Sequence, residues 1–227
     1  MKVNNPKLIV GMLALSLALP LALTTGHAAG QPSSKVTYQT SDLTLIPETT
    51  GTGDWVTVLA NVLKTANNKD LFISGSLEVG LYTQTLVKSK NMTKDTSTAT
   101  VSIQVRALVD GAAAAPGVVT YAARTQTLSA TLEGAIAGCL TTVVNADGTV
   151  SIVLDEACVT PEEIELILST LNAASFDFVA VDVPQGVHTI SLQARITSSS
   201  TATTGTASAT GFVGKGTVIV ESVRLAK

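Results

Sequence analysis

The sequence predicts an all-β protein, in which two antiparallel sheets pack face to face as a β-sandwich of jelly-roll or Greek-key type, with one short α-helix. Three observations support this fold. Short segments rich in Val, Ile, Thr and Tyr are separated by Gly, Pro, Asn and Asp. Strands do not alternate with long helices, as a parallel sheet would require. Charged residues make up only 14% of the chain, so hydroxyl groups must cover much of the surface, as in many extracellular β-proteins.

The N-terminal residues 1–29 are expected to be a secretory signal peptide. Lys2 and Lys7 precede an apolar run over residues 8–23, and small residues follow around Ala28. An uncleaved membrane anchor is the alternative, but the run is a little short for a bilayer span of about 20 residues. We therefore expect an exported protein that is secreted, periplasmic or on the cell surface, with no membrane span after cleavage.

The remaining chain is expected to comprise a linker over residues 30–35 and a single β-sandwich domain over residues 36–227. This length is sufficient to bury a substantial core. Loss of Lys2 and Lys7 with the signal peptide changes the formal charge from -3 to -5. No nucleic-acid partner is expected, because phosphate binding requires clustered Lys and Arg.

Eleven segments have the composition of strands. The segment Thr57–Thr65 fits a helix almost as well, and we interpret it as a strand. The most distinct turn is Asn145–Gly148, because Asp147 and Gly148 tolerate left-handed backbone and predict a hairpin. The expected strands are residues 36–46, 55–65, 71–88, 98–109, 118–132, 140–144, 149–154, 176–181, 188–197, 206–213 and 217–225.

The short helix is predicted over residues 160–174. Thr160 and Glu163 form a capping box, and Pro161 stands at the first helical position, where its missing N–H costs nothing. Apolar residues then recur at helical spacing. They are Ile164, Ile167, Leu168 and Leu171.

The two cysteines, Cys139 and Cys158, are expected to form a disulfide, because an even number of cysteines in an exported protein indicates an oxidised pair. A thiol nucleophile or a metal pair is the alternative, but no His or third Cys lies nearby in sequence. No metal site or cofactor is predicted, because histidines and further cysteines are too few.

A polar strand face is the candidate ligand-binding surface. The pattern Ser-x-Gln-x-Arg occurs at residues 102–106 and again at 191–195, and alternation along a strand places its three polar residues on one side. Arg and Gln offer several hydrogen-bonding groups to sugars or carboxylates. A solvated strand face without a ligand is the simpler alternative, as is a core position for the single tryptophan. The candidate residues are Trp55, Gln104, Arg106, Arg124, Gln126, Gln193 and Arg195.

His188 is expected to be a structural residue at the start of a strand. It shares parity with the apolar Ile190 and Leu192, so it should point inward just after the turn at Pro184–Gly186. A catalytic histidine would need a positioned nucleophile or carboxylate, and no G-x-S-x-G motif is present. We therefore predict no catalytic residues and no enzymatic activity.

The resulting hypothesis is an exported, non-enzymatic protein that acts by surface contact as a cell-envelope, matrix or adhesion component. A polysaccharide or another surface protein is the expected partner. A homo-oligomer is the second hypothesis, in which subunits join through sheet edges and the segment Lys35–Pro47 completes a neighbour's sheet.

A secreted hydrolase is the third and least favoured hypothesis. It would require two carboxyl groups about 5 to 10 Å apart across an open groove. The acidic residues considered are Glu78, Asp110, Glu133 and Asp155.

Overall fold

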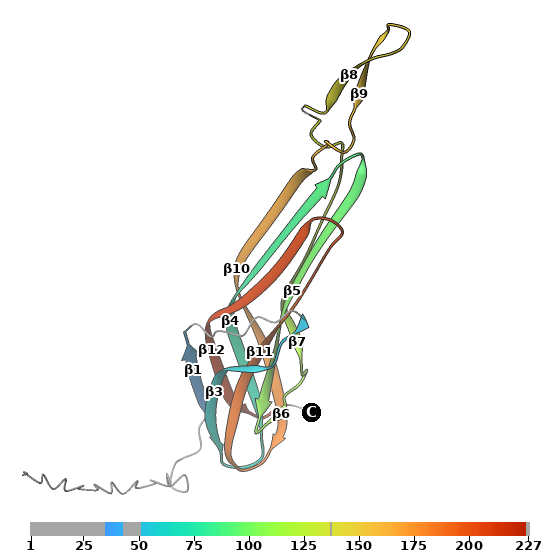
Figure 1. The fold of residues 1–227 in the computed structure, drawn as a ribbon. Coiled ribbons are helices and arrows are strands. Elements are labelled where there is room, and N and C mark those ends of the chain that lie inside the picture. Colours follow the sequence, from blue (N-terminus) through green and yellow to red (C-terminus); the bar gives the residue numbers. More distant parts are fainter. Residues whose placement is uncertain (1–34, 43–50, 137, 226–227) are drawn as a thin grey trace, which may run out of the picture. The chain divides into compact units, whose positions relative to one another are not determined.

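The structure is a computed structural model that describes residues 35–42, 51–136 and 138–225. These residues form strands and connecting turns, so the all-β prediction is confirmed (Figure 1). The predicted signal peptide lies outside them, as does the predicted linker up to residue 34. In the described ranges no helix has the length and apolar character needed to cross a bilayer.

The strands follow in this order: β1 (Val36–Ser41), β2 (Gly51–Thr52), β3 (Val56–Thr65), β4 (Lys69–Ser89), β5 (Thr93–Val109), β6 (Ala112–Ala113), β7 (Val119–Leu132), β8 (Leu140–Val144), β9 (Val150–Leu154), β10 (Glu162–Val183), β11 (Gly186–Ala202) and β12 (Thr206–Val223). The segment that fits a helix almost as well lies in β3 and is a strand, as predicted. The two C-terminal segments predicted separately are one strand, β12, which continues through an irregularity between Val213 and Gly216.

Two four-stranded antiparallel sheets make up the sandwich. One has the order β1-β12-β4-β10, and the other has β3-β11-β5 with β7 on the far side of β5, where β6 pairs with the last residues of β5. Eight strands remain when the two-residue strands and the pair β8–β9 are set aside. In chain order, the first, eighth, third and sixth of these form one sheet, and the second, seventh, fourth and fifth form the other. This is the strand order of a jelly roll.

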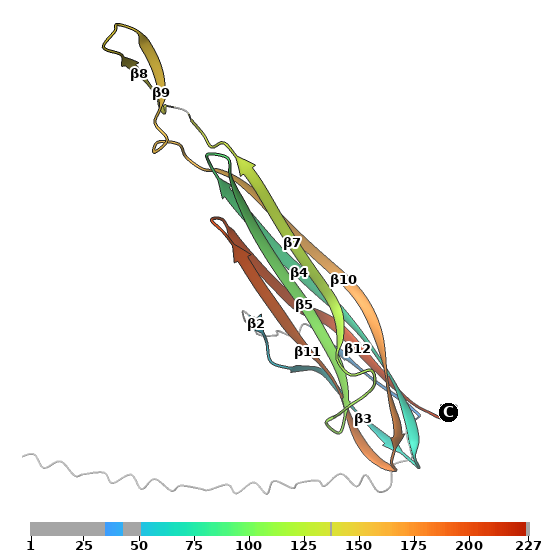
Figure 2. The same ribbon diagram turned by 90° about the vertical axis from the view of Figure 1, so that its right-hand side faces the viewer.

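Several strands are long, and the sandwich differs between its two ends. β4 has 21 residues and β10 has 22, which at about 3.3 Å per residue gives strands of about 70 Å. β1 pairs only with Gly216–Glu221 of β12, and β3 pairs only with Gly186–Ala194 of β11. All eight strands are therefore present together only in the half of the sandwich nearer the β3–β4 turn, whereas six continue toward the β4–β5 turn (Figure 2).

The core lies between the sheets and follows the predicted alternation. Ile73 and Phe178 from one sheet and Ile103, Ile190 and Leu192 from the other are all 0% exposed. The polar residues of both Ser-x-Gln-x-Arg patterns point to the other side of their strands, where they are half-buried. The prediction that these apolar side chains are sealed between two layers is thus confirmed.

The predicted helix is wrong, because residues Glu162–Val183 form strand β10. This strand pairs with β4 over almost the whole length of both, and such pairing outweighs a weak local helix preference. Thr160 forms a bridge with Ala135 instead of capping a helix. Glu163 forms a salt bridge with Lys88, its partner residue on β4, at 2.6 Å.

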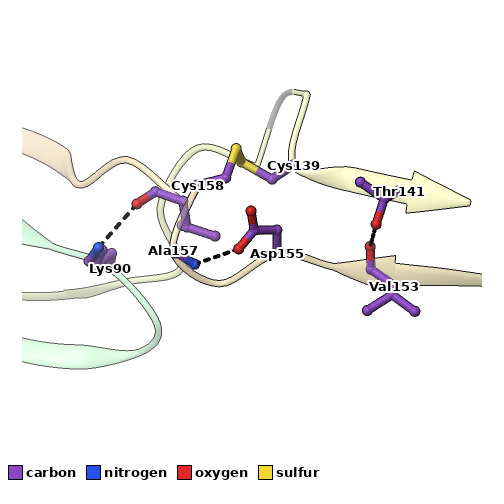
Figure 3. The surroundings of a disulfide bond; sticks show 8 residues. Lys90, Cys139, Thr141, Val153, Asp155, Ala157 and Cys158 are labelled. Atoms are coloured by element: carbon purple, nitrogen blue, oxygen red, sulfur yellow. Dashed lines mark hydrogen bonds between the residues drawn. A yellow bond between two sulfur atoms is a disulfide. The ribbon is translucent and has the colours of Figure 1, made fainter.

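The predicted disulfide between Cys139 and Cys158 is present, with a Cα–Cα distance of 5.4 Å (Figure 3). It closes the base of the β8–β9 hairpin, whose turn at Asn145–Gly148 is also as predicted. Lys90 Nζ donates a 3.2 Å hydrogen bond to the carbonyl oxygen of Val159 and so joins this base to the β4–β5 turn. The disulfide therefore links the residue that precedes β8 to the loop that precedes β10. A disulfide is typical of an oxidising compartment.

Candidate ligand-binding site

Five of the seven predicted ligand-binding residues meet on the outer face of the second sheet. We call Trp55, Gln104, Arg106, Gln193 and Arg195 the Trp55 cluster. The guanidinium carbon of Arg106 lies 4.3 Å from the centroid of the Trp55 ring, and that of Arg195 lies 4.6 Å from it. Trp55 is half-buried and lies over strand residues, so it is neither a core anchor nor a free platform.

The pairing of β5 with β11 creates this arrangement. Gln193 lies opposite Arg106, and Arg195 lies opposite Gln104. Directly opposite residues in an antiparallel pair project to the same face. Arg106 Nε therefore donates to Gln193 Oε1 at 2.9 Å, and Arg195 Nε donates to Gln104 Oε1 at 2.8 Å.

The segment before β3 carries the tryptophan onto this face. The backbone N–H of Gly53 donates a 2.9 Å hydrogen bond to the carbonyl oxygen of Ile196 on β11. Two residues later, Trp55 lies over the two arginines. Gln193 Nε2 also donates to Thr57 Oγ1 on β3 at 3.2 Å. Contacts with β3, β5 and β11 therefore hold the side chains of the cluster in place.

The cluster is positively charged, and only some of its hydrogen-bond donors have a partner. Neither arginine forms a salt bridge with a carboxylate of the described residues. Each uses its Nε in a hydrogen bond, and the terminal nitrogens Nη1 and Nη2 make no hydrogen bond with the described residues. Two cations that face one aromatic ring repel each other, while the ring stabilises each of them. An anionic or hydroxyl-bearing ligand would supply acceptors for these nitrogens.

The other two predicted residues, Arg124 and Gln126, do not join the cluster. They share a face of β7, as predicted, but this face points between the sheets. Gln126 is 5% exposed; its Nε2 donates to Leu166 O at 2.7 Å and its Oε1 accepts from Thr83 Oγ1 at 2.7 Å. Arg124 Nη1 donates to Leu168 O at 2.9 Å.

Both side chains of β7 thus bond to carbonyl groups along the edge of β10. Tyr121, also on β7, donates to the carbonyl oxygen of Ala174 and accepts a 2.8 Å hydrogen bond from the N–H of Leu77. Burial raises the pKa of the Tyr121 hydroxyl, against the effect of that N–H. These contacts supply donors to carbonyl groups at the edge of β10, which could otherwise pair with a strand of another chain.

His188 lies at the end of the sandwich near the β3–β4 turn and is 5% exposed, as its parity predicted. Its Nδ1 lies 2.7 Å from Asp110 Oδ2 and its Nε2 lies 2.9 Å from the carbonyl oxygen of Pro184. Each of the two ring nitrogens therefore faces an oxygen atom of a neighbouring turn. The hydrogen bond from His188 lowers the pKa of Asp110, helped by the N–H of Thr189 and opposed by burial.

A cavity of about 480 Å³ adjoins this histidine. Its lining from β5, β6 and β10 is mostly Val and Ala, and it contains no Ser, Thr or Cys that could act as a nucleophile beside His188. The contact between His188 and Asp110 ties β11 to the β5–β6 turn.

The four carboxylates considered for a hydrolase lie on different parts of the fold. Glu78 is in the middle of β4 and Asp110 follows β5, and these two line different cavities. Glu133 follows β7, and Asp155 follows β9. Among the described residues no group of three or more His, Cys, Asp or Glu is placed to hold a metal ion.

Two features of the site were not foreseen from the sequence. The contact between Trp55 and the two arginines depends on where the segment before β3 crosses the sheet, which no local pattern reveals. The partner of His188 is Asp110, from a turn 78 residues earlier in the chain. A signal for the second feature was present, since Asp110-Gly111 ends a strand and predicts a turn.

No protein-family model matches the chain, and no curated protein is significantly similar to it. The fold and the Trp55 cluster define the class as a disulfide-containing jelly roll with a cationic aromatic cluster on one sheet. Function is therefore inferred from the chemistry of the residues themselves.

Proposed function

We propose that this protein is an exported, non-enzymatic surface-contact protein that binds carbohydrate through the Trp55 cluster. The observation that carries the proposal is the convergence of Arg106 and Arg195 on one tryptophan ring, with their terminal nitrogens unoccupied by the described residues. The disulfide supports export, because such bonds persist in oxidising compartments.

The chemistry of the cluster favours an acidic polysaccharide over a neutral one. Planar guanidinium groups bind carboxylates with two parallel hydrogen bonds. The amide nitrogen of Gln104 adds a donor for which no partner is present in the described parts of the chain. The exposed part of the indole ring offers an apolar surface to a sugar ring.

The binding test compares retention on acidic and neutral polysaccharide columns, followed by a glycan array. The double variant Arg106→Ala with Arg195→Ala should bind an acidic polysaccharide more than about tenfold more weakly, since hydrogen bonds to charged groups contribute about 1.5 to 3 kcal/mol each. Trp55→Ala should weaken binding in the same direction, because it removes the ring that both guanidinium groups contact.

The matched control is Lys94→Ala with Lys215→Ala, which removes the same charge from two exposed positions outside the cluster. Its retention should stay within about twofold of the wild type, because isolated surface charges contribute little. Unchanged retention of the arginine double variant, or equal losses in both double variants, would show that the cluster is not the binding site.

The structure of β1 supports a second candidate function, a structural subunit assembled by strand exchange. β1 is six residues long and pairs on one side only, with the end of β12. Its Val36 and Tyr38 are 55% and 71% exposed, so the strand buries little of the core. Within the described ranges, Thr206–Val213 of β12 pair only with β4, which leaves an edge where a strand could add.

Deletion of Lys35–Pro47 tests strand exchange. If β1 joins subunits, the deletion should abolish open-ended oligomers in light scattering while the circular dichroism of the sheets is retained. Oligomers that persist after the deletion, or a wild-type protein without open-ended oligomers, would contradict this function. Trp55→Ala serves as the control, because it alters the polar face and leaves β1 intact.

A further inference from the structure

The β8–β9 hairpin carries an apolar face that nothing in the described part of the chain covers. Its register places Leu140 opposite Leu154, Thr142 opposite Ile152, and Val144 opposite Val150. These six residues project to one side, because directly opposite residues share a face. We call them the hairpin face. Its five apolar members range from 40% exposed at Leu154 to 72% at Ile152.

The opposite side of the hairpin is shorter and more polar. It consists of Thr141, Val143, Ser151 and Val153, so hydroxyl groups make up half of it. Ser151 is half-buried and donates to the carbonyl oxygen of Val143 at 3.5 Å. The two sides therefore differ in apolar character, and they provide matched positions for a test.

The hairpin is an incomplete structural unit. β8 and β9 form a separate two-stranded sheet that, in the part of the chain described, pairs with no other strand. Two strands alone are marginally stable in water and need further strands or a packing partner. The disulfide closes only the base of the hairpin. A partner on the hairpin face would supply the missing layer.

Charge around the hairpin restricts the kind of partner. The strand residues are uncharged, whereas Asp147 lies in the turn and Asp155 and Glu156 lie at the base, all of them exposed. These carboxylates oppose contact with an anionic bilayer. Insertion of the turn into hydrocarbon would also bury the charge of Asp147, whose pKa is lowered by the hydroxyl and N–H of Thr149.

We propose that the hairpin face binds the same face of a second copy of this chain in a two-fold symmetric contact. An uncharged apolar face is chemically complementary to itself, and symmetric pairing is the commonest form of protein dimer. Two stacked hairpins about 10 Å apart form a four-stranded unit. Covering both faces removes on the order of 1,000 Å² from water, the lower limit for a specific interface.

This contact is separate from the Trp55 cluster, which lies on β5, β11 and the segment before β3. It is also separate from β1, so it yields a closed dimer rather than an open-ended chain. Failure of the dimer would therefore leave the proposed carbohydrate binding untouched, and failure of the binding would leave the dimer untouched.

Sedimentation velocity and native mass spectrometry of the exported protein test the proposal. The wild type should show a concentration-dependent dimer at micromolar concentrations. Val144→Ser with Ile152→Ser, on the hairpin face, should raise the dissociation constant more than about tenfold. Val143→Ser with Val153→Ser, on the opposite side, is the matched control and should change it less than about twofold. The Cys139–Cys158 bond is verified by mass in each variant.

Cross-linking supplies a measurement that does not depend on affinity. Thr142 lies at the centre of the hairpin face, next to the expected two-fold axis, so Thr142→Cys should give a disulfide-linked dimer under mild oxidation. Thr141→Cys, one residue away on the opposite side, should not.

A monomeric wild type at high concentration, equal losses in the two double variants, or equal cross-linking at both positions would overturn the proposal. Flotation with neutral phosphatidylcholine vesicles that depends on Ile152 would do so as well, since the hairpin face would then bind lipid.

Discussion

Replacing Asp95 by Ala is expected to lower the free energy of unfolding by about 3 kcal/mol, because buried donors left without acceptors cost about 1 to 3 kcal/mol each. Asp95 is only 1% exposed. Its carboxylate accepts hydrogen bonds from the N–H groups of Lys88 at 2.7 Å, Thr96 at 2.8 Å and Thr204 at 3.0 Å. One side chain therefore joins the end of β4, the start of β5 and the β11–β12 turn.

The same carboxylate gives the stability a pH dependence of defined sign. Burial alone raises the pKa of Asp95, but the hydrogen bonds from Lys88, Thr204 and Thr96 outweigh burial, and the pKa lies below its ordinary value of 3.8. A lowered pKa in the folded state means that the stabilisation is present above the unfolded-state value and is lost as the pH falls through the folded-state value. The wild type should therefore lose stability below about pH 4.

Urea unfolding at pH 7 and at pH 3 measures both effects. Asp95→Asn keeps an acceptor oxygen and removes the titration, so its stability should change less over this range than that of the wild type. Asp147→Asn is the control at an exposed turn, where global unfolding should not change. A loss of less than about 1 kcal/mol in Asp95→Ala, within the range of ordinary substitutions, would show that water or neighbouring groups replace the carboxylate.

The strand framework could be predicted because the alternation of apolar and polar residues is a local property. Ile103 and Val105 on β5 point inward, and Gln104 and Arg106 point outward. The matching pattern on β11 likewise places Gln193 and Arg195 on the outward side. The polar sides of β5 and β11 that form the Trp55 cluster could therefore be identified from the sequence. The cysteine pair could be predicted for a similar reason, since its chemistry depends on compartment and count.

The helix could not be excluded from the sequence, because its signals and those of a strand overlap. Thr160 and Glu163 satisfy the spacing of a capping box, and Ile164, Ile167 and Leu171 satisfy helical spacing. What decides the outcome is β4, a strand long enough to hydrogen-bond the whole segment. That pairing joins residues more than 70 positions apart and leaves no local trace.

Arg124 and Gln126 were wrongly predicted to lie on the ligand-binding face, and this error also arises because tertiary contacts leave no local pattern in the sequence. Their shared side of β7 was correct, but the sequence does not reveal which side of an edge strand faces the other sheet. Polar residues usually face water, whereas Gln126 is buried and fully hydrogen-bonded between Thr83, Thr85 and β10. A buried glutamine with every polar atom satisfied resembles a surface residue in sequence alone.

The β11–β12 turn should be the position most sensitive to a small substitution. In Gly205→Ala, the added Cβ would lie 1.8 Å from the carbonyl oxygen of Leu86 and 2.9 Å from the Cα of Val87. Both are backbone atoms of β4, whose pairing with β10 on one side and with β12 on the other holds them in place. No side chain can rotate away, so the turn must separate from β4.

That separation also removes neighbouring contacts. Thr204 Oγ1 donates to the carbonyl oxygen of Lys88 at 2.7 Å, and the N–H of Thr203 donates to that of Thr96 at 3.1 Å. We therefore expect Gly205→Ala to cost more than about 4 kcal/mol, which single substitutions reach only through strain or lost buried contacts. Urea unfolding, with the soluble yield as a second measure, checks this value.

Gly214→Ala separates backbone crowding from the loss of a glycine as such. Its added Cβ would lie 2.9 Å from Oε2 of Glu78, the far end of a flexible side chain. The carboxylate can move aside, so this variant should lose less than about 1 kcal/mol, as for most substitutions without a specific clash. Equal losses at both glycines would show that chain flexibility, rather than contact with β4, sets the requirement. A loss confined to Gly205→Ala would identify the contact of the β11–β12 turn with β4 and Asp95 as the structural requirement. This contact would then fix the positions of the two sheets relative to each other toward the β4–β5 end.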